Sequence, residues 1–283
     1  MSLGRLRKHF SDPLFVRTSR GMEPTPYATD LIAEVKKASD ILEAAVERRM
    51  HFDPSSSDRM FHLCSTDIAQ FTILPPLVKV LAAVAPGVRI DLRSIPTDLP
   101  RLLESGEADL AIGLIPPLGA GFCQQKLFAS RFLCALRVDH PRVKNELTLE
   151  RYQAESHLSV TTVGTGYHSL EKALEAHKIH RHVAMRVPSF LGVAAIVADT
   201  DYLVIVPQRL GRMLAENRLM KLLPLPFDLP GFYVTQNWHE RYTQDPPQQW
   251  FRNILMRIFR EDAESPRGPA VVPKSGKLRS RSR

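Results

Sequence analysis

The stretch LRKHFSDPLFVRTSRGMEPTP, residues 6–26, decides how the front of this chain folds. It opens on a basic helix that Asp12-Pro13 is predicted to end, because proline has no N–H to donate and restricts the residue before it. The apolar run Leu14–Val16 predicts a short strand. Gly21 suits the left-handed turn that would return the chain as a second strand. A basic helix followed by a two-stranded wing with arginine at its tip is typical of the end of a winged helix-turn-helix.

The two ends of the chain hold its excess of positive charge. Residues 1–20 carry five Lys or Arg against one acid, and residues 263–283 carry six against one, whereas residues 21–262 carry 27 against 28. A near-neutral body with a basic front predicts local contacts with phosphates, although an ordinary solvated face is the alternative. The residues predicted to contact DNA are Ser2, Arg5, Arg7, Lys8, Arg17, Thr18 and Arg20.

Composition bounds the class of protein. At 283 residues the chain suits two or three folded units, and 44% hydrophobic and 24% charged residues indicate a soluble globular protein. No apolar run approaches the roughly 20 residues of a membrane span, and no signal peptide is visible, so we expect a cytoplasmic protein. Three cysteines without CxxC spacing argue against a disulfide framework or a zinc site.

A long helix is predicted from Thr25 to Met50, with Thr25 as its cap. Apolar residues recur along it at alternating steps of three and four, as in a heptad seam: Ala28, Leu31, Val35, Ala38, Leu42 and Ala45. Such a seam either packs on its own domain or pairs with a second copy. Its place between a wing and the polar hinge 51–57 favours pairing with a second copy. Residues 25–57 are therefore predicted to form a dimerising linker. The residues predicted to meet the partner are Leu31, Val35 and Leu42.

From Arg59 onward, predicted strands and helices alternate, which is the pattern of an α/β unit with largely parallel sheets. One predicted helix runs from Thr66 to about Ala85, and Thr97 is predicted to cap another at 98–105. The expected divisions are a partial winged helix-turn-helix at 1–24, an effector-binding domain at 58–262 and a basic disordered tail at 263–283. Within the domain, lobe I covers about 58–132 and 233–262, and lobe II covers about 133–232.

No set of residues assembles a convincing catalytic or metal site. His177, His180 and His182 are close in sequence, but the run leaves a helix and enters a strand, so a solvated helix end is favoured over a metal site. The turn 164–166 lacks the third glycine of a dinucleotide-binding fingerprint, although an amide-rich turn can bind a small anion. We therefore expect a protein that is not an enzyme and has no cofactor.

The front of the chain resembles the LysR-type transcriptional regulators, in which DPLFVR, six variable residues and P-T-x-x-A follow a basic helix. The DLAIG strand at 109–113, after an ESGEA turn, is similar too. The similarity is greatest to the branch that senses salicylate and nitroaromatic compounds, through the runs TSRGMEPTPYA, TDI…LPPL, HFDP and VPQR. It covers about residues 1–262, nearly the whole chain outside the basic tail.

This resemblance implies an α/β, periplasmic-binding-like (type II) two-lobed effector domain after a partial winged helix-turn-helix and a long linker helix. It implies a regulator that binds operator DNA as a homodimer or homotetramer and responds to a small molecule. In the family a first helix and most of a second precede this point, so we expect a misplaced start or a fragment, with a natural regulator lacking DNA binding as the alternative. A solute-binding receptor of the same clamshell fold is the alternative function.

Ligands of open α/β folds sit beyond the carboxyl ends of the strands, so we expect effector contacts where strands lead into helices. The residues predicted there are Thr66, Thr97, Thr165, Tyr167, Ser189 and Phe190. Their hydroxyls and the nearby helix-start amides suit a small carboxylate, whereas Asp67 would repel an anion if it faced the cleft. In the salicylate-sensing branch, pocket histidines occupy the places that Tyr167 and Ser189 hold here.

Overall fold

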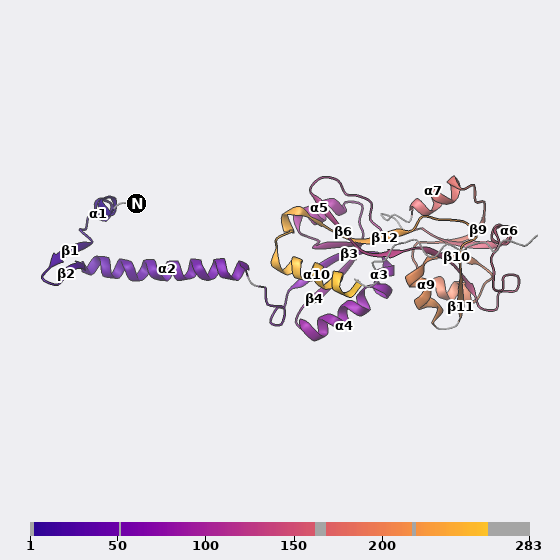
Figure 1. The fold of residues 1–283 in the computed structure, drawn as a ribbon, viewed down its shortest axis with the longest axis horizontal. Coiled ribbons are helices and arrows are strands. Elements are labelled where there is room, and N and C mark those ends of the chain that lie inside the picture. The colour runs from indigo at the N-terminus through magenta and orange to yellow at the C-terminus, as the bar shows by residue number, and fades with distance from the viewer. Residues whose placement is uncertain (1–2, 51, 162–167, 217–218, 260–283) are drawn as a thin grey trace, which may run out of the picture. The chain divides into compact units, whose positions relative to one another are not determined.

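A computed structural model describes residues 3–50, 52–161, 168–216 and 219–259 of the chain. Two compact units make up the protein, residues 1–53 and residues 54–283. The first unit holds two helices and a hairpin, and the second holds two five-stranded sheets with their helices (Figure 1). Residues 263–283, which were predicted to be disordered, lie outside the described residues.

The N-terminal unit is a helix, a hairpin and a long helix in chain order. Its elements are α1 (Leu3–Phe10), β1 (Phe15–Thr18), β2 (Gly21–Pro24) and α2 (Pro26–Met50). The two strands pair antiparallel, with Thr18 opposite Gly21 at the turn. Gly21 has a φ of 120°, in the left-handed region that favours glycine. The helix and wing predicted for residues 6–26 are therefore present.

Asp12 joins the wing to the start of the long helix. Its Oδ1 accepts a hydrogen bond from the Leu14 N–H at 2.7 Å and another from the Thr25 hydroxyl at 2.8 Å. The Thr25 Oγ1 accepts the Ala28 N–H at 3.0 Å, which caps the helix as predicted. One carboxylate therefore fixes both where β1 begins and how α2 leaves the hairpin.

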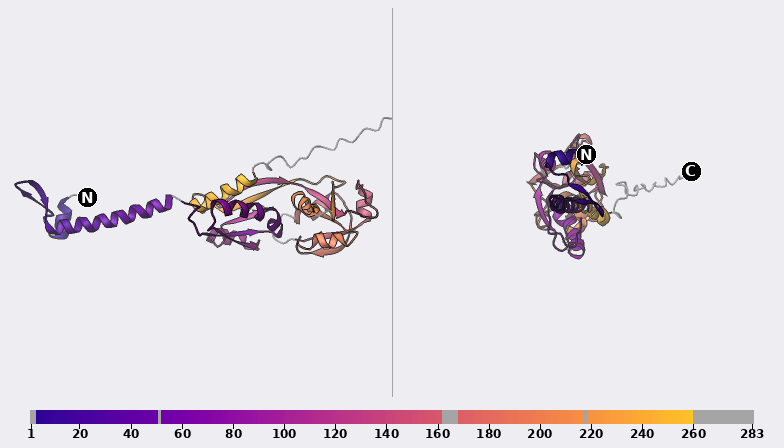
Figure 2. Two further views of the ribbon diagram at one scale, coloured as in Figure 1. Left: turned by 90° about the horizontal axis from the view of Figure 1, so that it is seen from below. Right: turned by 90° about the vertical axis from the view of Figure 1, so that its left-hand side faces the viewer.

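Lobe I of the second unit is a mixed sheet in the order β4-β3-β5-β12-β6. Its elements are β3 (Met60–Ser65), α3 (Asp67–Thr72), α4 (Leu74–Val84), β4 (Arg89–Ser94), α5 (Leu99–Ser105), β5 (Leu110–Gly113), β6 (Phe122–Ser130), β12 (Phe232–His239), the 3-10 turn η1 (Glu240–Tyr242) and α10 (Pro246–Phe259). β3 pairs parallel with β4 and β5, whereas β12 returns antiparallel to β5 and β6. Helices α4 and α10 lie against this sheet (Figures 1 and 2). The buried core includes residues of the sheet, α4 and α10, and the ring of Phe61 stacks on Phe251 with 4.2 Å between centroids.

Lobe II is a second mixed sheet, in the order β11-β7-β10-β8-β9. Its elements are β7 (Phe132–Arg137), α6 (Leu149–Ala154), β8 (Ser156–Val160), α7 (His168–Ala176), β9 (His182–Val187), α8 (Val193–Ala198), β10 (Leu203–Pro207), α9 (Gln208–Ala215) and β11 (Met220–Leu223). β8 pairs parallel with β9 and β10, whereas β7 is antiparallel to β10 and β11. Alternate residues of β10 enter two apolar clusters, one shared with α8 and α9 and the other with α6 and α7.

The lobes are joined where β6 passes into β7 and where β11 passes into β12. Only Arg131 separates β6 from β7. Its carbonyl oxygen accepts the Gln208 N–H at 2.8 Å, and its Nε–H donates to the Gln208 Oε1 at 2.9 Å. This pair of bonds holds the start of α9 against the crossover strand.

Three details of the predicted secondary structure are wrong. The helix expected from Thr66 to Ala85 is two helices that meet at Ile73, because Pro75 lacks an N–H and is accommodated only in the first turn of a new helix. The helix after β4 has Asp98 rather than Thr97 at its N-cap. Strand β11 was not predicted, since four residues are too short to show a clear alternation.

Candidate functional site

A small, partly open cavity lies between the two lobes. Lobe I contributes Thr66 at the start of α3 and Gly113 at the end of β5, and lobe II contributes Pro207 and Arg209 at the start of α9. Its volume is about 30 Å³, which is room for about two water molecules. The carboxyl ends of β3, β5 and β10 all reach this cavity, which is where an open α/β fold places a ligand.

Four hydroxyl side chains line the cavity, and two of them are already engaged. The Ser65 hydroxyl donates to the carbonyl oxygen of Ile112 at 2.5 Å, and the Thr72 hydroxyl donates to a carbonyl of its own helix at 2.9 Å. Thr66 stands at the N-cap of α3 without a side-chain capping bond. No hydrogen bond of the Thr66 or Ser130 side chain occurs within the described part of the chain, so both hydroxyls can serve a ligand.

Arg209 brings a cation to the same cavity. It is the second residue of α9, directly after the strand end at Pro207, and its guanidinium lies 5.0 Å from the ring centroid of Phe128 and 4.9 Å from that of Phe259. Arg209 was not among the effector contacts predicted from the sequence. The missed signal was the VPQR run itself, which places an arginine in the first turn of the helix that leaves β10.

Asp67 turns its carboxylate to the other lobe's backbone. One oxygen accepts the N–H of Phe190 in lobe II through a short hydrogen bond, and the other accepts the N–H of Ile68 at 3.0 Å. Ile68 is also buried in the apolar cluster of lobe II, together with Phe190. The Asp67 carboxylate, which would repel an anion if it faced the cleft, therefore holds the two lobes together.

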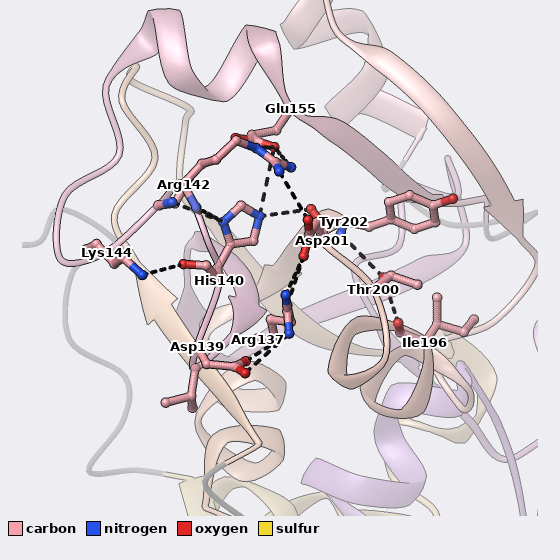
Figure 3. Close-up of polar contacts among 12 residues, drawn as sticks. Arg137, Asp139, His140, Arg142, Lys144, Glu155, Ile196, Thr200, Asp201 and Tyr202 are labelled. Atoms are coloured by element: carbon pink, nitrogen blue, oxygen red, sulfur yellow. Dashed lines mark hydrogen bonds and ion pairs between the residues drawn. The ribbon is translucent and has the colours of Figure 1, made fainter.

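A second polar cluster lies in lobe II, and none of its residues lines the cavity (Figure 3). His140 is fully buried, with its Nε2–H donating to the Asp201 carbonyl at 3.0 Å and its Nδ1 accepting the Arg142 N–H at 3.3 Å. The Arg142 guanidinium forms two close bonds with Glu155, at 2.7 and 2.9 Å. These partners engage one another, so the cluster fastens the loop after β7 to α6 and β10.

Asp201 in this cluster stays ionised. Burial alone would raise the pKa of its carboxyl, but hydrogen bonding and charge from Arg137, with the nearby Arg142, hold the pKa below its usual range. The Asp201 carboxylate therefore serves as the anionic partner of Arg137 and Arg142.

Most of the predicted DNA-contact residues lie on α1 and the hairpin. Arg5 and Lys8 are exposed on α1, and Arg17 and Arg20 are exposed at the end of the hairpin. The Thr18 hydroxyl donates to the Gly21 carbonyl at 3.3 Å and accepts the Arg20 N–H at 3.1 Å, so it shapes the tip. Ser2 lies outside the described residues.

Arg7, unlike Arg5 and Lys8, bonds to the backbone of its own unit. Its Nε–H donates to the carbonyl of Pro13 at 2.7 Å, and its Nη2–H donates to that of Phe15 at 3.4 Å. The guanidinium is therefore committed to the backbone that starts the wing, and spacing along the helix could not show this.

The middle of the α2 seam, from Val35 to Leu42, is exposed. Leu31 is half-buried, whereas Val35 is 58% exposed and Leu42 is 67% exposed. Apolar side chains of this size stay out of water only when another surface covers them.

The comparisons with known proteins decide the family. The family model described as the LysR substrate binding domain matches residues 55–260. The HTH-type transcriptional activator NagR of Ralstonia sp. is 38% identical over 92% of this chain and 87% of its own length. The chain belongs to the LysR family of transcriptional regulators. NahR of Pseudomonas putida, another HTH-type transcriptional activator, is 38% identical over 91% of this chain and 86% of its own length.

A crystal structure supports the same assignment. The probable transcriptional regulator PA0477 from Pseudomonas aeruginosa is 34% identical and aligns with a TM-score of 0.67, over 89% of this chain and 85% of that one. The LysR resemblance, the two-lobed type II fold and the role of a DNA-binding regulator with an effector-binding domain are thereby confirmed. The protein is a regulator rather than an enzyme, and the receptor alternative is set aside.

No helix among the described residues is long and apolar enough to cross a membrane. No three His, Cys, Asp or Glu side chains among them gather as a metal-binding group.

The LysR effector residues expected from the sequence fall in several places. Thr66 lines the cavity. Thr97 is exposed and does not line it. The Ser189 hydroxyl accepts the Leu191 N–H at 3.1 Å, and Phe190 is buried beneath it. Thr165 and Tyr167 lie outside the described residues.

Proposed function

We propose that this LysR regulator binds a small organic carboxylate in the cavity between its lobes, and that the binding changes how an oligomer holds operator DNA. The observation that carries the proposal is the meeting of Thr66 and Ser130 from lobe I with Arg209 from lobe II around one cavity. A guanidinium and two hydroxyls suit a carboxylate, because charge-assisted hydrogen bonds are the strong ones.

The apolar lining of the cavity determines which kind of carboxylate fits. Leu114 and Phe232 line it beside Ile68 and Leu210. Such walls favour an acid with a ring or a short apolar body over a sugar acid or a nucleotide. Thr97, Thr165, Tyr167, Ser189 and Phe190 stay in the proposal as effector contacts predicted from the sequence.

The size of the cavity requires a movement. At about 30 Å³ it is roughly ten times smaller than the smallest usual ligand pockets, which hold roughly 300 Å³. The lobes must part or their walls must shift to admit an effector. That movement works against the bond between Asp67 and the Phe190 N–H and against the burial of Ile68 in lobe II.

The proposed DNA contacts are the exposed cations of the N-terminal unit. Arg5, Lys8, Arg17 and Arg20 face solvent and suit the phosphates of an operator, and Thr18 shapes the tip of the hairpin. Ser2 stays in the proposal as a DNA contact predicted from the sequence. The exposed middle of the α2 seam suits pairing with a second copy, as a homodimer or as part of a homotetramer. A regulator of operator DNA works in the cytoplasm.

A thermal-shift screen of small aromatic and aliphatic acids on the full chain tests the effector site. Thr66→Val should weaken a stabilising acid by roughly tenfold, near the 1–2 kcal/mol of a lost hydrogen bond. Arg209→Gln should weaken it further, because a bond to a charged group contributes roughly 1.5–3 kcal/mol.

Arg186→Gln is the matched control, since it removes an exposed cation of lobe II that lines no part of the cavity. The melting temperature of each variant without acid shows whether folding itself has changed. A stabilising acid whose affinity is unaltered in both test variants would place the effector elsewhere.

A further inference from the structure

An open groove lies beside the interlobe cavity, along helix α9. Its volume is about 590 Å³, within the roughly 300–1,000 Å³ typical of small-molecule sites. The ring of Phe71 and the faces of Pro75 and Pro76 line it from the α3–α4 segment, and Ala129 lines it from β6. These residues form the apolar wall of a groove whose other side is polar.

The charge of the groove has one sign. Arg209 and Arg212, three residues apart on α9, both line it, and no acid is among the described residues that do so. Arg212 is exposed, and its guanidinium makes no ion pair or hydrogen bond with any residue that the structure describes. A guanidinium fork matches a carboxylate in a bidentate pair, so this groove attracts an organic anion.

The packing of α9 fixes where these arginines lie. A Cβ built on Gly211 would come within 2.9 Å of both Val206 and Leu222, so only glycine lets the helix sit this close to β10 and β11. Leu210, on the face of α9 that packs against the sheet, is buried. The face that carries Arg209 and Arg212 is thereby turned to the groove.

The groove and the cavity share a wall. Thr72, Phe128, Ser130 and Arg209 line both spaces. The guanidinium of Arg209 lies over the ring of Phe128 at this boundary. A ligand of the proposed class fits the groove while the cavity, at about 30 Å³, is still too small for it.

We propose that the groove is an outer holding site, in which an organic carboxylate docks on Arg212 before it passes Arg209 into the cavity. This inference rests on the proposed effector site and adds the route to it. Binding then has two steps, a fast capture in the groove and a slower transfer that needs the lobes to move. Arg212 acts on the route and not in the final complex.

A residue that contacts the ligand only during entry and exit changes the rates of binding but not the affinity. Arg212 still holds the carboxylate while the lobes part, so weakening this contact raises the rate-limiting barrier equally for arrival and departure. Both rate constants then fall by the same factor and the equilibrium Kd does not change. A residue of the final site instead changes the Kd. This difference separates Arg212 from Thr66 and Arg209.

Stopped-flow binding of salicylate to the full chain, followed through the fluorescence of salicylate, is the test. Arg212→Gln should slow association and dissociation alike by about fivefold, a modest fraction of what electrostatic steering achieves. Ala129→Phe, which narrows the groove without changing charge, should slow both rates in the same way. Arg186→Gln removes an equal charge from β9 and should leave both rates near those of the natural chain.

Each outcome decides the matter. Equal slowing in both groove variants at constant Kd supports the route. A changed Kd for Arg212→Gln, or unaltered rates in both variants, would overturn the route while the proposed cavity site stands. No salicylate binding at all would overturn the inference together with the aromatic-acid class of effector.

Discussion

His157 is fully buried in strand β8 of lobe II. Its Nε2–H donates to the carbonyl oxygen of Tyr152 at 2.7 Å, whereas its Nδ1 has no partner among the described residues. Burial lowers the pKa of this imidazole to about 4, because a charged ring would lie in an apolar core. The ring is therefore neutral in the folded protein near pH 7.

The stability of the effector domain should fall as the pH drops from about 6.5 to about 4. The unfolded chain protonates His157 near its ordinary pKa of 6.5, but the folded chain does so only near 4. In between, the unfolded state binds more protons, so acid favours unfolding by up to about 3 kcal/mol. Urea unfolding across this range measures the effect.

His157→Gln should flatten this pH dependence, because glutamine offers a donor to Tyr152 but does not titrate in the range. His180→Gln is the control, since His180 is exposed and a change there should leave the curve parallel to that of the natural chain. If His157→Gln unfolds with an unaltered pH profile, the acid sensitivity arises from another group.

Single residues also show what a sequence hides. Arg7 and Arg17 both look like phosphate contacts, but only the folded wing reveals that Arg7 is bonded to Pro13 and Phe15. Asp67 could have faced the cleft or the other lobe, and its partner lies 123 residues away along the chain. Contacts between residues so far apart in the sequence depend on how the lobes meet, and no local sequence pattern predicts that.

At the scale of elements, the sequence was informative wherever a local rule dominates. The wing, the Thr25 cap and the alternation of strands and helices follow from turn residues and periodicity, and all are present. The break at Ile73 was missed because apolar spacing continues through it, and Pro75 was treated as part of one helix. The cavity lining was predicted at Thr66 but not at Arg209 or Ser130, since those depend on how the lobes meet.

Helix α2 should dimerise through its apolar seam. Leu31→Asp combined with Leu42→Asp would place charges against apolar partners, which costs several kcal/mol each unless the interface opens. Analytical ultracentrifugation should then show loss of the dimer that depends on α2, with the effector domain still folded by circular dichroism.

Ala33→Asp with Lys36→Asp is the matched control, because both positions are exposed and lie off the seam. It adds acid to the same helix and should leave the assembly intact. An unchanged oligomer in the seam variant, after pairing through isolated effector domains has been subtracted, would show that α2 packs in another way.

At the scale of the whole molecule, the arginines of one wing act together with those of the partner chain. Each cation that neutralises a phosphate releases counterions, so log K falls with log[salt] by about 0.9 per phosphate. Arg17 and Arg20 are exposed on the hairpin, and a dimer presents each of them twice. A dimer formed through α2 is therefore expected to depend on salt about twice as steeply as a single wing.

Arg17→Gln with Arg20→Gln should therefore make the salt slope of a dimer shallower by up to about 3.6, for four lost phosphate contacts. Affinity should drop on operator and unrelated duplexes alike, because phosphate contacts carry no sequence information. Fluorescence anisotropy over a salt series measures both quantities. Arg186→Gln with Arg151→Gln removes the same charge from exposed positions of the effector domain and should not alter the slope. A wing variant that keeps the natural slope would mean that the hairpin does not touch the DNA backbone.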